Sequence, residues 1–149
     1  MIQGVAIKKV TAHKSEDGFF AELAKAGEEI FHEIRQTSYS ETSAGAIKAF
    51  HNHKEYWEMW CVIKGRAKIV LADIREDSPT KGEIEVVMTG EGDMKVIAIP
   101  PGVAHGYQVL GTTPMGIIYH AGKEYDPANP GIEEIPHDSP MIGFDWSAV

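Results

Sequence analysis

Two stretches of this chain, GAIKAFHNHKEYWEMWCVIKG at residues 45–65 and PPGVAH at residues 100–105, decide how it folds. Each stretch is typical of β-strands bounded by glycine or proline, which favour turns. Together they carry three histidines and one glutamate in a fixed spacing: His51, His53, Glu58 and His105. Imidazole and carboxylate groups bind divalent metals or transfer protons, so these four side chains are the first candidates for a functional site.

The spacing predicts that these side chains meet. His51 and His53 are two residues apart, and alternate side chains of a strand leave the same face, so they should converge on one point. Glu58 follows a bend expected at residues 54–55 and begins a second strand, which ends at a turn at residues 64–65. With His105 the set is three imidazoles and one carboxylate, which suits zinc, iron, manganese or nickel with coordination positions left open. The residues alone leave metal binding and metal-free proton transfer as alternatives.

Composition limits the class of protein. With 149 residues, 43% of them hydrophobic and 24% charged, the chain is expected to form one domain, residues 1–149, with a real core. A net charge of −8 argues against binding to nucleic acid or to an anionic membrane surface. Cys61 is the only cysteine, so no disulfide framework is expected and a reducing cytoplasm is the natural setting. The chain has no apolar run of membrane-spanning length, and we expect no membrane partner.

The pattern along the chain is mostly that of short strands, which indicates an all-β sandwich or barrel. Strands are predicted at residues 1–12, 33–39, 46–53, 56–63, 66–75, 83–88, 94–99, 103–110 and 114–121, with a turn at 15–18. One short N-terminal helix is predicted at residues 19–31, although Gly27 weakens its middle. The proline-containing tail, residues 126–149, is expected to lie extended across the barrel or a neighbouring subunit.

The two stretches resemble the two signature motifs of the cupin superfamily, whose fold is a jelly-roll β-barrel with the site inside its mouth. The first motif matches at every anchored position, whereas in the second Val109 stands where the pattern has asparagine. A narrower resemblance, to the dTDP-4-dehydrorhamnose 3,5-epimerase family, covers most of the chain. It is carried by collinear segments at residues 17–20, Gln36 with Ser40, 45–51, 73–75 with 78–80, 99–100, 102–106, Tyr119, 125–127 and 131–132.

The family resemblance implies a sugar epimerase that moves protons next to the ketone of a nucleotide-linked 4-keto-6-deoxy sugar, without a metal cofactor. By motif position, His51 would be the histidine base and Tyr119 the tyrosine acid. Lys48 would place positive charge near the oxygen where negative charge develops. A second set of residues is expected to bind the substrate: Arg35, Gln36, His105 and Tyr125. The family also implies a homodimer in which edge strands pair between subunits.

Five departures from the family pattern concern the site. Lys48 stands where the family has arginine, and Asp17 where it has an arginine that helps to hold the nucleotide diphosphate. His53 and Glu58 stand where the family has glutamine and lysine, and both changes favour a metal. The family's base is oriented by an aspartate in a longer C-terminal region, for which Asp138 or Glu58 are the substitutes within this chain.

Other functions remain open at this stage. The segment FHNHK at residues 50–54 is similar to a motif of the sugar 3,4-ketoisomerases, in which both histidines transfer protons without metal. A metal-dependent cupin enzyme, either a dioxygenase or a metal-assisted isomerase, would use His51, His53, Glu58 and His105 as ligands. A non-catalytic sugar-binding cupin would use the same cavity for binding alone. The aromatic residues Tyr56, Trp57 and Trp60 are expected to be packing residues rather than sugar-stacking platforms.

Overall fold

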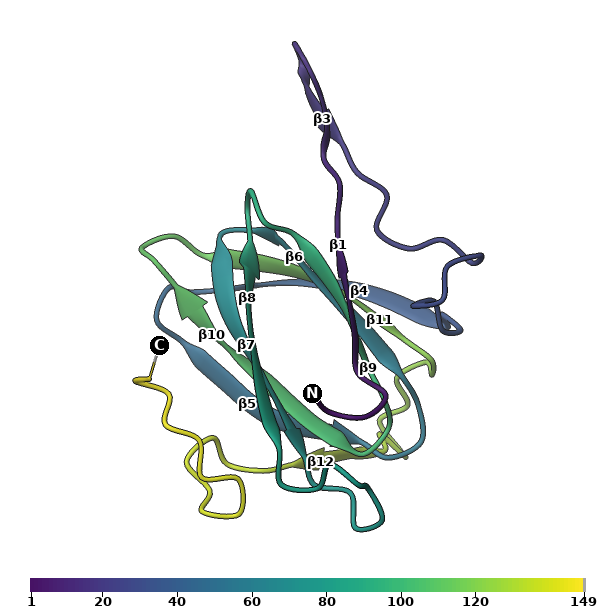
Figure 1. The fold of residues 1–149 in the computed structure, drawn as a ribbon, viewed down its shortest axis with the longest axis vertical. Helices are drawn as coiled ribbons and strands as arrows, with labels where there is room; N and C mark the ends of the chain where they lie inside the picture. The colour runs from purple at the N-terminus through teal and green to yellow at the C-terminus, as the bar shows by residue number, and fades with distance from the viewer. Residues whose placement is uncertain (149) are drawn as a thin grey trace.

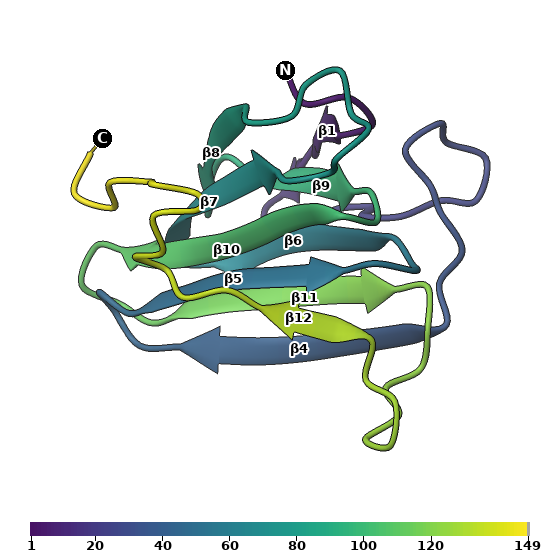
Figure 2. The same ribbon diagram turned by 90° about the horizontal axis from the view of Figure 1, so that it is seen from below.

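The fold consists of two five-stranded antiparallel sheets that face each other, plus a small hairpin (Figures 1 and 2). The computed structural model describes residues 1–148. The first sheet has the strand order β1-β9-β6-β11-β4 and the second β12-β5-β10-β7-β8. The strands are β1 (Ala6–Lys9), β2 (His13–Ser15), β3 (Gly18–Phe20), β4 (Gln36–Thr42), β5 (Ile47–His53), β6 (Glu58–Lys64), β7 (Arg66–Asp73), β8 (Ile84–Gly90), β9 (Lys95–Ile99), β10 (Val103–Leu110), β11 (Met115–Ala121) and β12 (Ile132–Glu134).

The predicted all-β jelly roll is confirmed, and the central strands lie close to their predicted positions. Residues 46–53, 66–75 and 103–110, for example, correspond to β5, β7 and β10. These strands contain β-branched and aromatic residues, and a glycine lies shortly before each of them, at positions 45, 65 and 102, so the local signal is strong. The turns at residues 54–55 and 64–65 lie where they were expected, and the second carries the chain from one sheet to the other.

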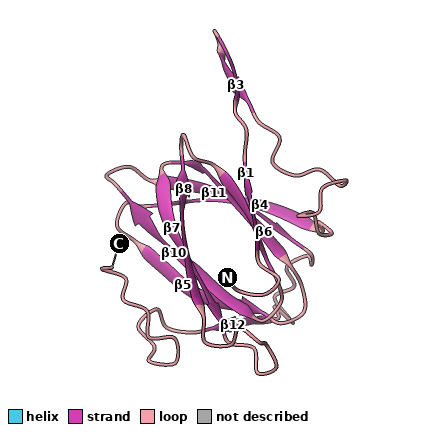
Figure 3. Cartoon of the chain, viewed as in Figure 1, coloured by secondary structure: helices cyan, strands magenta, loops and turns pink. Residues whose placement is uncertain are grey.

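The predicted N-terminal helix is wrong. Residues 18–20 form β3, which pairs with β2 in a hairpin, and residues 21–35 are irregular; Figure 3 shows no helix within residues 1–148. The apolar residues that suggested a helix, Leu23, Ile30 and Phe31, instead pack on the outer face of the first sheet. Docking on that flat apolar surface outweighs a weak helical propensity. No helix in residues 1–148 has the length and apolar character needed to cross a membrane.

The core lies between the two sheets and is continuous from one to the other. Ile69 and Leu71 of β7 meet Ile97 of β9 and Ile117 of β11 there, and all four are almost fully buried. Close packing of these branched side chains leaves little freedom in the spacing of the sheets. The core therefore fixes the distance between opposite walls of the barrel.

The C-terminal tail covers the outer face of the second sheet, as its predicted extended course suggested. β12 pairs with β5, and Trp146 and Phe144 then pack beside Phe50. The buried ammonium of Lys68 donates to the carbonyl oxygens of Trp146 at 2.8 Å and Ala148 at 2.5 Å. In Figure 2 the tail runs across β10 and β5 towards the C-terminus. The outer face of β5 is thus buried, which leaves its inner face for the site.

The register of β5 against β10 places two of the predicted site residues side by side. His105 lies opposite His51, and the register shifts just beyond this pair, at Gly106. A Cβ atom added to Gly106 would lie 2.6 Å from the Ala49 Cα and 2.7 Å from the Lys48 carbonyl oxygen. Only glycine permits this approach of the two strands.

We predict that Gly106→Ala lowers the free energy of unfolding by about 1–3 kcal/mol, because the added methyl group forces β5 and β10 apart. Gly27→Ala is the matched control, since a Cβ at Gly27 meets no atom within 4 Å. Urea denaturation of both variants measures the difference. Equal midpoints for Gly106→Ala, Gly27→Ala and the unmodified protein would show that the strands tolerate a wider spacing.

Candidate functional site

A pocket of about 390 Å³, here called the barrel pocket, opens between the two sheets. It is lined by Gln36, Ser40, Lys48, His51, His53, Tyr56, Glu58, Trp60, His105, Tyr107, Ile117, Tyr119, Ala121, Lys123, Tyr125 and Ile132. These residues come from β4, β6 and β11 of the first sheet, from β5, β10 and β12 of the second, and from two connections. An apolar cavity with a few convergent polar groups is the usual form of a small-molecule site.

The barrel pocket brings together nearly all the predicted site residues. His51, Lys48 and Tyr119, the predicted catalytic set, line it, and so do Gln36, His53, Glu58, His105 and Tyr125. Arg35 is the exception. It was predicted to bind substrate, but it lies outside the pocket. Its guanidinium pairs with Glu33 at 3.0 Å on an exposed surface. Arg35 directly precedes β4, where the chain has not yet entered the barrel wall.

His53, Glu58 and His105 form a buried cluster in the pocket, here called the floor cluster. One oxygen of Glu58, Oε1, lies 2.8 Å from His53 Nε2 and 3.1 Å from His105 Nε2. The indole nitrogen of Trp60 donates to the same oxygen at 3.3 Å. Burial alone would raise the pKa of Glu58, but hydrogen bonds from His105 and His53, and their charges, lower it to about 2. Glu58 is therefore an anion at neutral pH.

Both ring nitrogens of His105 have a partner. Its Nδ1 lies 2.9 Å from the Val103 carbonyl oxygen, and its Nε2 lies 3.1 Å from the Glu58 carboxylate. The two contacts fix the orientation of the ring, and His105 has no unused ring nitrogen to offer to the pocket.

His51 lies apart from the floor cluster, which corrects the predicted set of four metal ligands. The ligand atoms of His53, Glu58 and His105 lie within 4.8 Å of one another, and His51 is not part of this group. His51 and His53 do line the same pocket, but two residues along a strand span about 6.6 Å. The ring of His53 therefore reaches Glu58, and the ring of His51 does not. The side chain of His51 is half exposed near Glu134 of β12.

The surroundings of His51 favour its neutral form. Burial lowers its pKa, and the positive charges of His105 and His53 lower it further, while the carboxylate of Glu134 acts in the opposite direction. The Glu134 oxygen lies 3.8 Å from His51 Nε2 because β12 pairs with β5 and sets the two residues opposite each other. The carboxylate beside His51 is therefore Glu134, for which no sequence signal was recognised, and Asp138 does not line the pocket.

Tyr56 is a second residue that sequence reasoning missed. It was expected to be a packing residue, yet it lines the barrel pocket and its hydroxyl lies 2.6 Å from His53 Nδ1. Its position in the loop between His53 and Glu58 was the only available signal. Burial, followed by the charge of Glu58, raises the pKa of Tyr56 to about 12.

Two further contacts shape the mouth of the pocket. The Gln36 side-chain oxygen accepts a hydrogen bond of 2.8 Å from the Tyr125 amide, and Lys123 donates to the Asn129 carbonyl oxygen at 3.0 Å. The first contact holds the segment after β11 against β4 of the first sheet, and the second lies within that segment. Tyr119 of β11 packs against the core, facing β5 from the opposite sheet.

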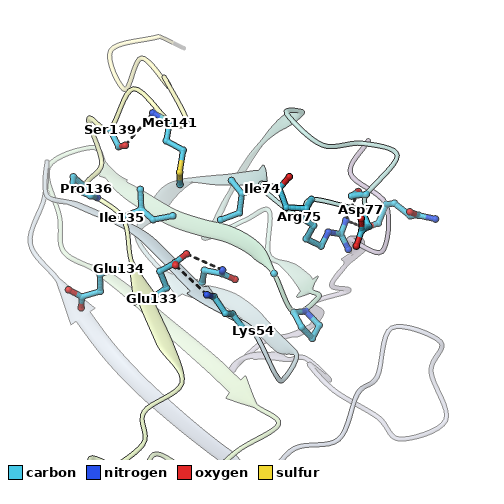
Figure 4. A pocket seen from close by; sticks show the side chains of 16 residues that line it. Lys54, Ile74, Arg75, Asp77, Glu133, Glu134, Ile135, Pro136, Ser139 and Met141 are labelled. Atoms are coloured by element: carbon cyan, nitrogen blue, oxygen red, sulfur yellow. Dashed lines mark hydrogen bonds and ion pairs between the residues drawn. The ribbon is translucent and has the colours of Figure 1, made fainter.

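A larger cleft of about 910 Å³ lies on the outside of the second sheet, and Figure 4 shows it. Lys54 and Glu133 pair across it at 3.4 Å, and Ile74 and Ile135 form apolar walls. Asn52 faces this cleft because it alternates with His51 and His53 along β5. None of the predicted site residues lines the cleft, so the chemistry concentrates in the barrel pocket.

Comparisons with known proteins agree with this geometry. The family model described as dTDP-4-dehydrorhamnose 3,5-epimerase matches residues 1–149. The spore coat polysaccharide biosynthesis protein SpsL of Bacillus subtilis is 46% identical over 147 residues, which cover 99% of this chain and 97% of that protein. A probable low-salt glycan biosynthesis epimerase of Haloferax volcanii is 32% identical over 149 residues, covering 99% and 96%.

Solved structures show the same likeness. A dTDP sugar isomerase from Desulfovibrio desulfuricans superimposes with a TM-score of 0.91 at 25% identity, covering 99% of this chain and 94% of that one. An epimerase from Legionella pneumophila, in complex with dTDP-4-keto-L-rhamnose, has a TM-score of 0.83 at 25% identity, covering 95% and 78%. The similarity therefore extends over both sheets.

We predict that Glu58→Gln lowers the free energy of unfolding by about 3 kcal/mol or more, because it removes the buried carboxylate that His53, His105 and Trp60 all contact. Glu134→Gln is the control, since it removes a carboxylate from an exposed position beside the same pocket. Chemical denaturation at neutral pH compares the two variants. Equal stability of Glu58→Gln and Glu134→Gln would contradict a stabilising role for the Glu58 carboxylate.

Proposed function

This chain belongs to the dTDP-4-dehydrorhamnose 3,5-epimerase family, and from that premise we propose that it epimerises or isomerises a nucleotide-linked 4-keto-6-deoxy sugar. The reaction moves protons on the carbons next to the ketone. The observation that carries the proposal is that His51 and Tyr119 line one pocket from opposite sheets. A sugar ring between them has a base on one face and an acid on the other.

His51 is the base in this proposal. A general base works best when it is neutral at the operating pH and within reach of the proton that it removes. Burial and the neighbouring cations lower the pKa of His51, so the ring is unprotonated at neutral pH. Its half-exposed position also leaves room for a substrate against it.

Tyr119 and Lys48 complete the proposed catalytic set. Tyr119 returns a proton from the opposite face of the sugar, which inverts the carbon centre. Lys48 places a positive charge near the enolate oxygen that forms after proton removal. Gln36, Tyr125 and the buried ring of His105 surround the sugar. The pocket volume of about 390 Å³ suits a hexose ring, so the nucleotide lies at the mouth, near Lys48 and Lys123.

A metal-dependent cupin enzyme is the second candidate function, because the floor cluster could hold zinc, iron, manganese or nickel. It offers two imidazole nitrogens and one carboxylate oxygen within 4.8 Å. Both nitrogens, however, point at Glu58 Oε1 at hydrogen-bond distance, an arrangement that protons satisfy. The proton-bridged geometry supports metal-free catalysis, which is also what family resemblance implies.

The proposal extends to assembly and location. Phe19 and Phe20 are 60% and 65% exposed on the β2–β3 hairpin, which projects far from the barrel in Figure 1. Exposed aromatic residues on a projecting hairpin favour burial against another subunit, and we infer a homodimer. Sedimentation tests this inference: the parent protein should be a dimer, and a Phe19→Ser/Phe20→Ser variant should be a monomer.

The proposal also covers location and domain organisation. The single buried cysteine suits the cytoplasm, and residues 1–149 are taken to act as one domain.

We predict that the protein catalyses incorporation of deuterium from D₂O into a dTDP-linked 4-keto-6-deoxyhexose at the carbons next to the ketone. His51→Asn should lower kcat by about 100-fold or more and leave KM nearly unchanged, because it removes the base and not the binding surface. Mass spectrometry of the recovered sugar measures exchange. No exchange above the heat-inactivated control, over a panel of such sugars, would refute the epimerase proposal.

Two controls separate the other candidates. Elemental analysis of protein purified without a histidine tag distinguishes the metal enzyme. A stoichiometric metal that is lost in His53→Gln, together with activity, would favour that candidate over metal-free catalysis. A non-catalytic sugar-binding module would bind the sugar equally well with His51→Asn and would produce no exchange at all.

A further inference from the structure

The barrel pocket carries different charges at its floor and at its mouth. Glu58 is the only carboxylate among the lining residues, and it lies on the floor. The lysines that line the pocket are Lys48, on β5, and Lys123, in the connection after β11. The mouth therefore offers positive charge on a chain whose net charge is −8. A local positive charge of this kind attracts an anion that the protein as a whole repels.

Neither of these lysines is neutralised by a carboxylate in the described part of the chain. Many basic side chains within residues 1–148 pair with an acid, as Lys54 does with Glu133 at 3.4 Å. Lys48 and Lys123 form no ion pair in that range. A phosphate group that enters the mouth therefore meets ammonium groups without first displacing a protein carboxylate.

Contacts within its own connection hold the Lys123 side chain in place. Its Nζ donates to the Asn129 carbonyl oxygen at 3.0 Å, and a Cβ atom added at Gly131 would lie 3.6 Å from the same nitrogen. The turn that carries Asn129 is closed by a hydrogen bond of 3.0 Å from its amide to the Asp126 carbonyl oxygen. Lys123 is also half-buried, so a ligand that binds it immobilises little further side-chain freedom. An ammonium group has three N–H donors, and two of them remain for a ligand.

The segment at residues 123–125 presents alternate side chains to the mouth. Lys123 and Tyr125 line the pocket, and Glu124 between them does not. Glu124 acts instead on Arg35, whose pKa is raised first by the Glu33 carboxylate and further by the charge of Glu124. The acidic neighbour of Lys123 thus lies on the other side of the segment and leaves the charge at the mouth uncancelled.

We propose that Lys123 binds the diphosphate of the nucleotide-linked substrate, while Lys48 serves the sugar. The inference rests on the proposed epimerase function and assigns a residue to the charged group of its substrate. Lys48 lies three residues before His51 on the same strand, so its charge is placed near the carbon centre where the base works. Lys123 comes from the connection that follows the opposite sheet. Its two remaining N–H groups can donate to phosphate oxygens in charge-assisted hydrogen bonds, which are stronger than neutral ones.

The test is titration calorimetry of dTDP binding to the full chain at low and at high salt. Lys123→Gln should weaken binding at least tenfold at low salt, because a charge-assisted contact is lost. It should also reduce the salt dependence of the affinity, since less charge attraction remains to be screened. Lys123→Arg keeps the charge and should bind within about threefold of the parent. If Lys123 only tethers the turn at Asn129, Lys123→Gln will keep the salt dependence of the parent, which would overturn the inference.

Lys64→Gln is the matched control. Lys64 lies outside the barrel pocket and pairs with Glu41 at 3.4 Å, so its loss should leave the affinity for dTDP unchanged. Thermal melting of each variant confirms folding. Binding of dTDP by Lys123→Gln as tight as by the parent, or a parent that does not bind dTDP, also overturns the inference. Deuterium exchange by the unmodified protein is measured separately, so a failure of the epimerase function is recognised independently of either result.

Discussion

One buried anion organises the site. The Glu58 carboxylate is removed from water, which costs several kcal/mol unless donors replace the lost hydration. The donors are His53 of β5, His105 of β10 and Trp60 of β6. Because β5 and β10 belong to the second sheet and β6 to the first, one charge ties both sheets at the pocket. The positions of the surrounding side chains follow from that attachment.

The two-sheet architecture gives the pocket two faces with different chemistry. β5 carries a base whose neutral form is favoured, and β11, on the opposite sheet, carries a phenol. The core between the sheets is packed with branched residues such as Ile69 and Ile117, which fixes their separation. In the proposed reaction, proton removal on one face of the sugar and return on the other follow from the arrangement of the two sheets.

The strands and the site were largely predictable because their signals are local. Alternation and glycine turns determine β5, β7 and β10, and the histidine spacing places the reactive groups on one face. The remaining features depend on contacts that no local pattern encodes. The segment at residues 21–35 follows the surface of the first sheet rather than its own helical periodicity, and β12 forms only because β5 presents a free edge.

The errors in the site have a similar origin. His51 was grouped with the metal ligands because the spacing shows which face a side chain occupies and not how far it reaches. Arg35 was expected to bind substrate from a strand predicted at residues 33–39, yet β4 begins one residue after it, at Gln36. Glu134 enters through the pairing of β12 with β5, which is a long-range contact. Side-chain direction could be inferred from sequence, whereas distance across the barrel could not.

The two replacements at the pocket floor make physical sense only together. The family pattern has glutamine and lysine where this chain has His53 and Glu58. A lysine at position 58 could only donate hydrogen bonds, whereas the Glu58 carboxylate accepts them and contacts both imidazoles. His53 in turn contacts the Tyr56 hydroxyl through its other ring nitrogen. In the proposed reaction, the positive charge near the developing oxyanion then comes from Lys48 and not from residue 58.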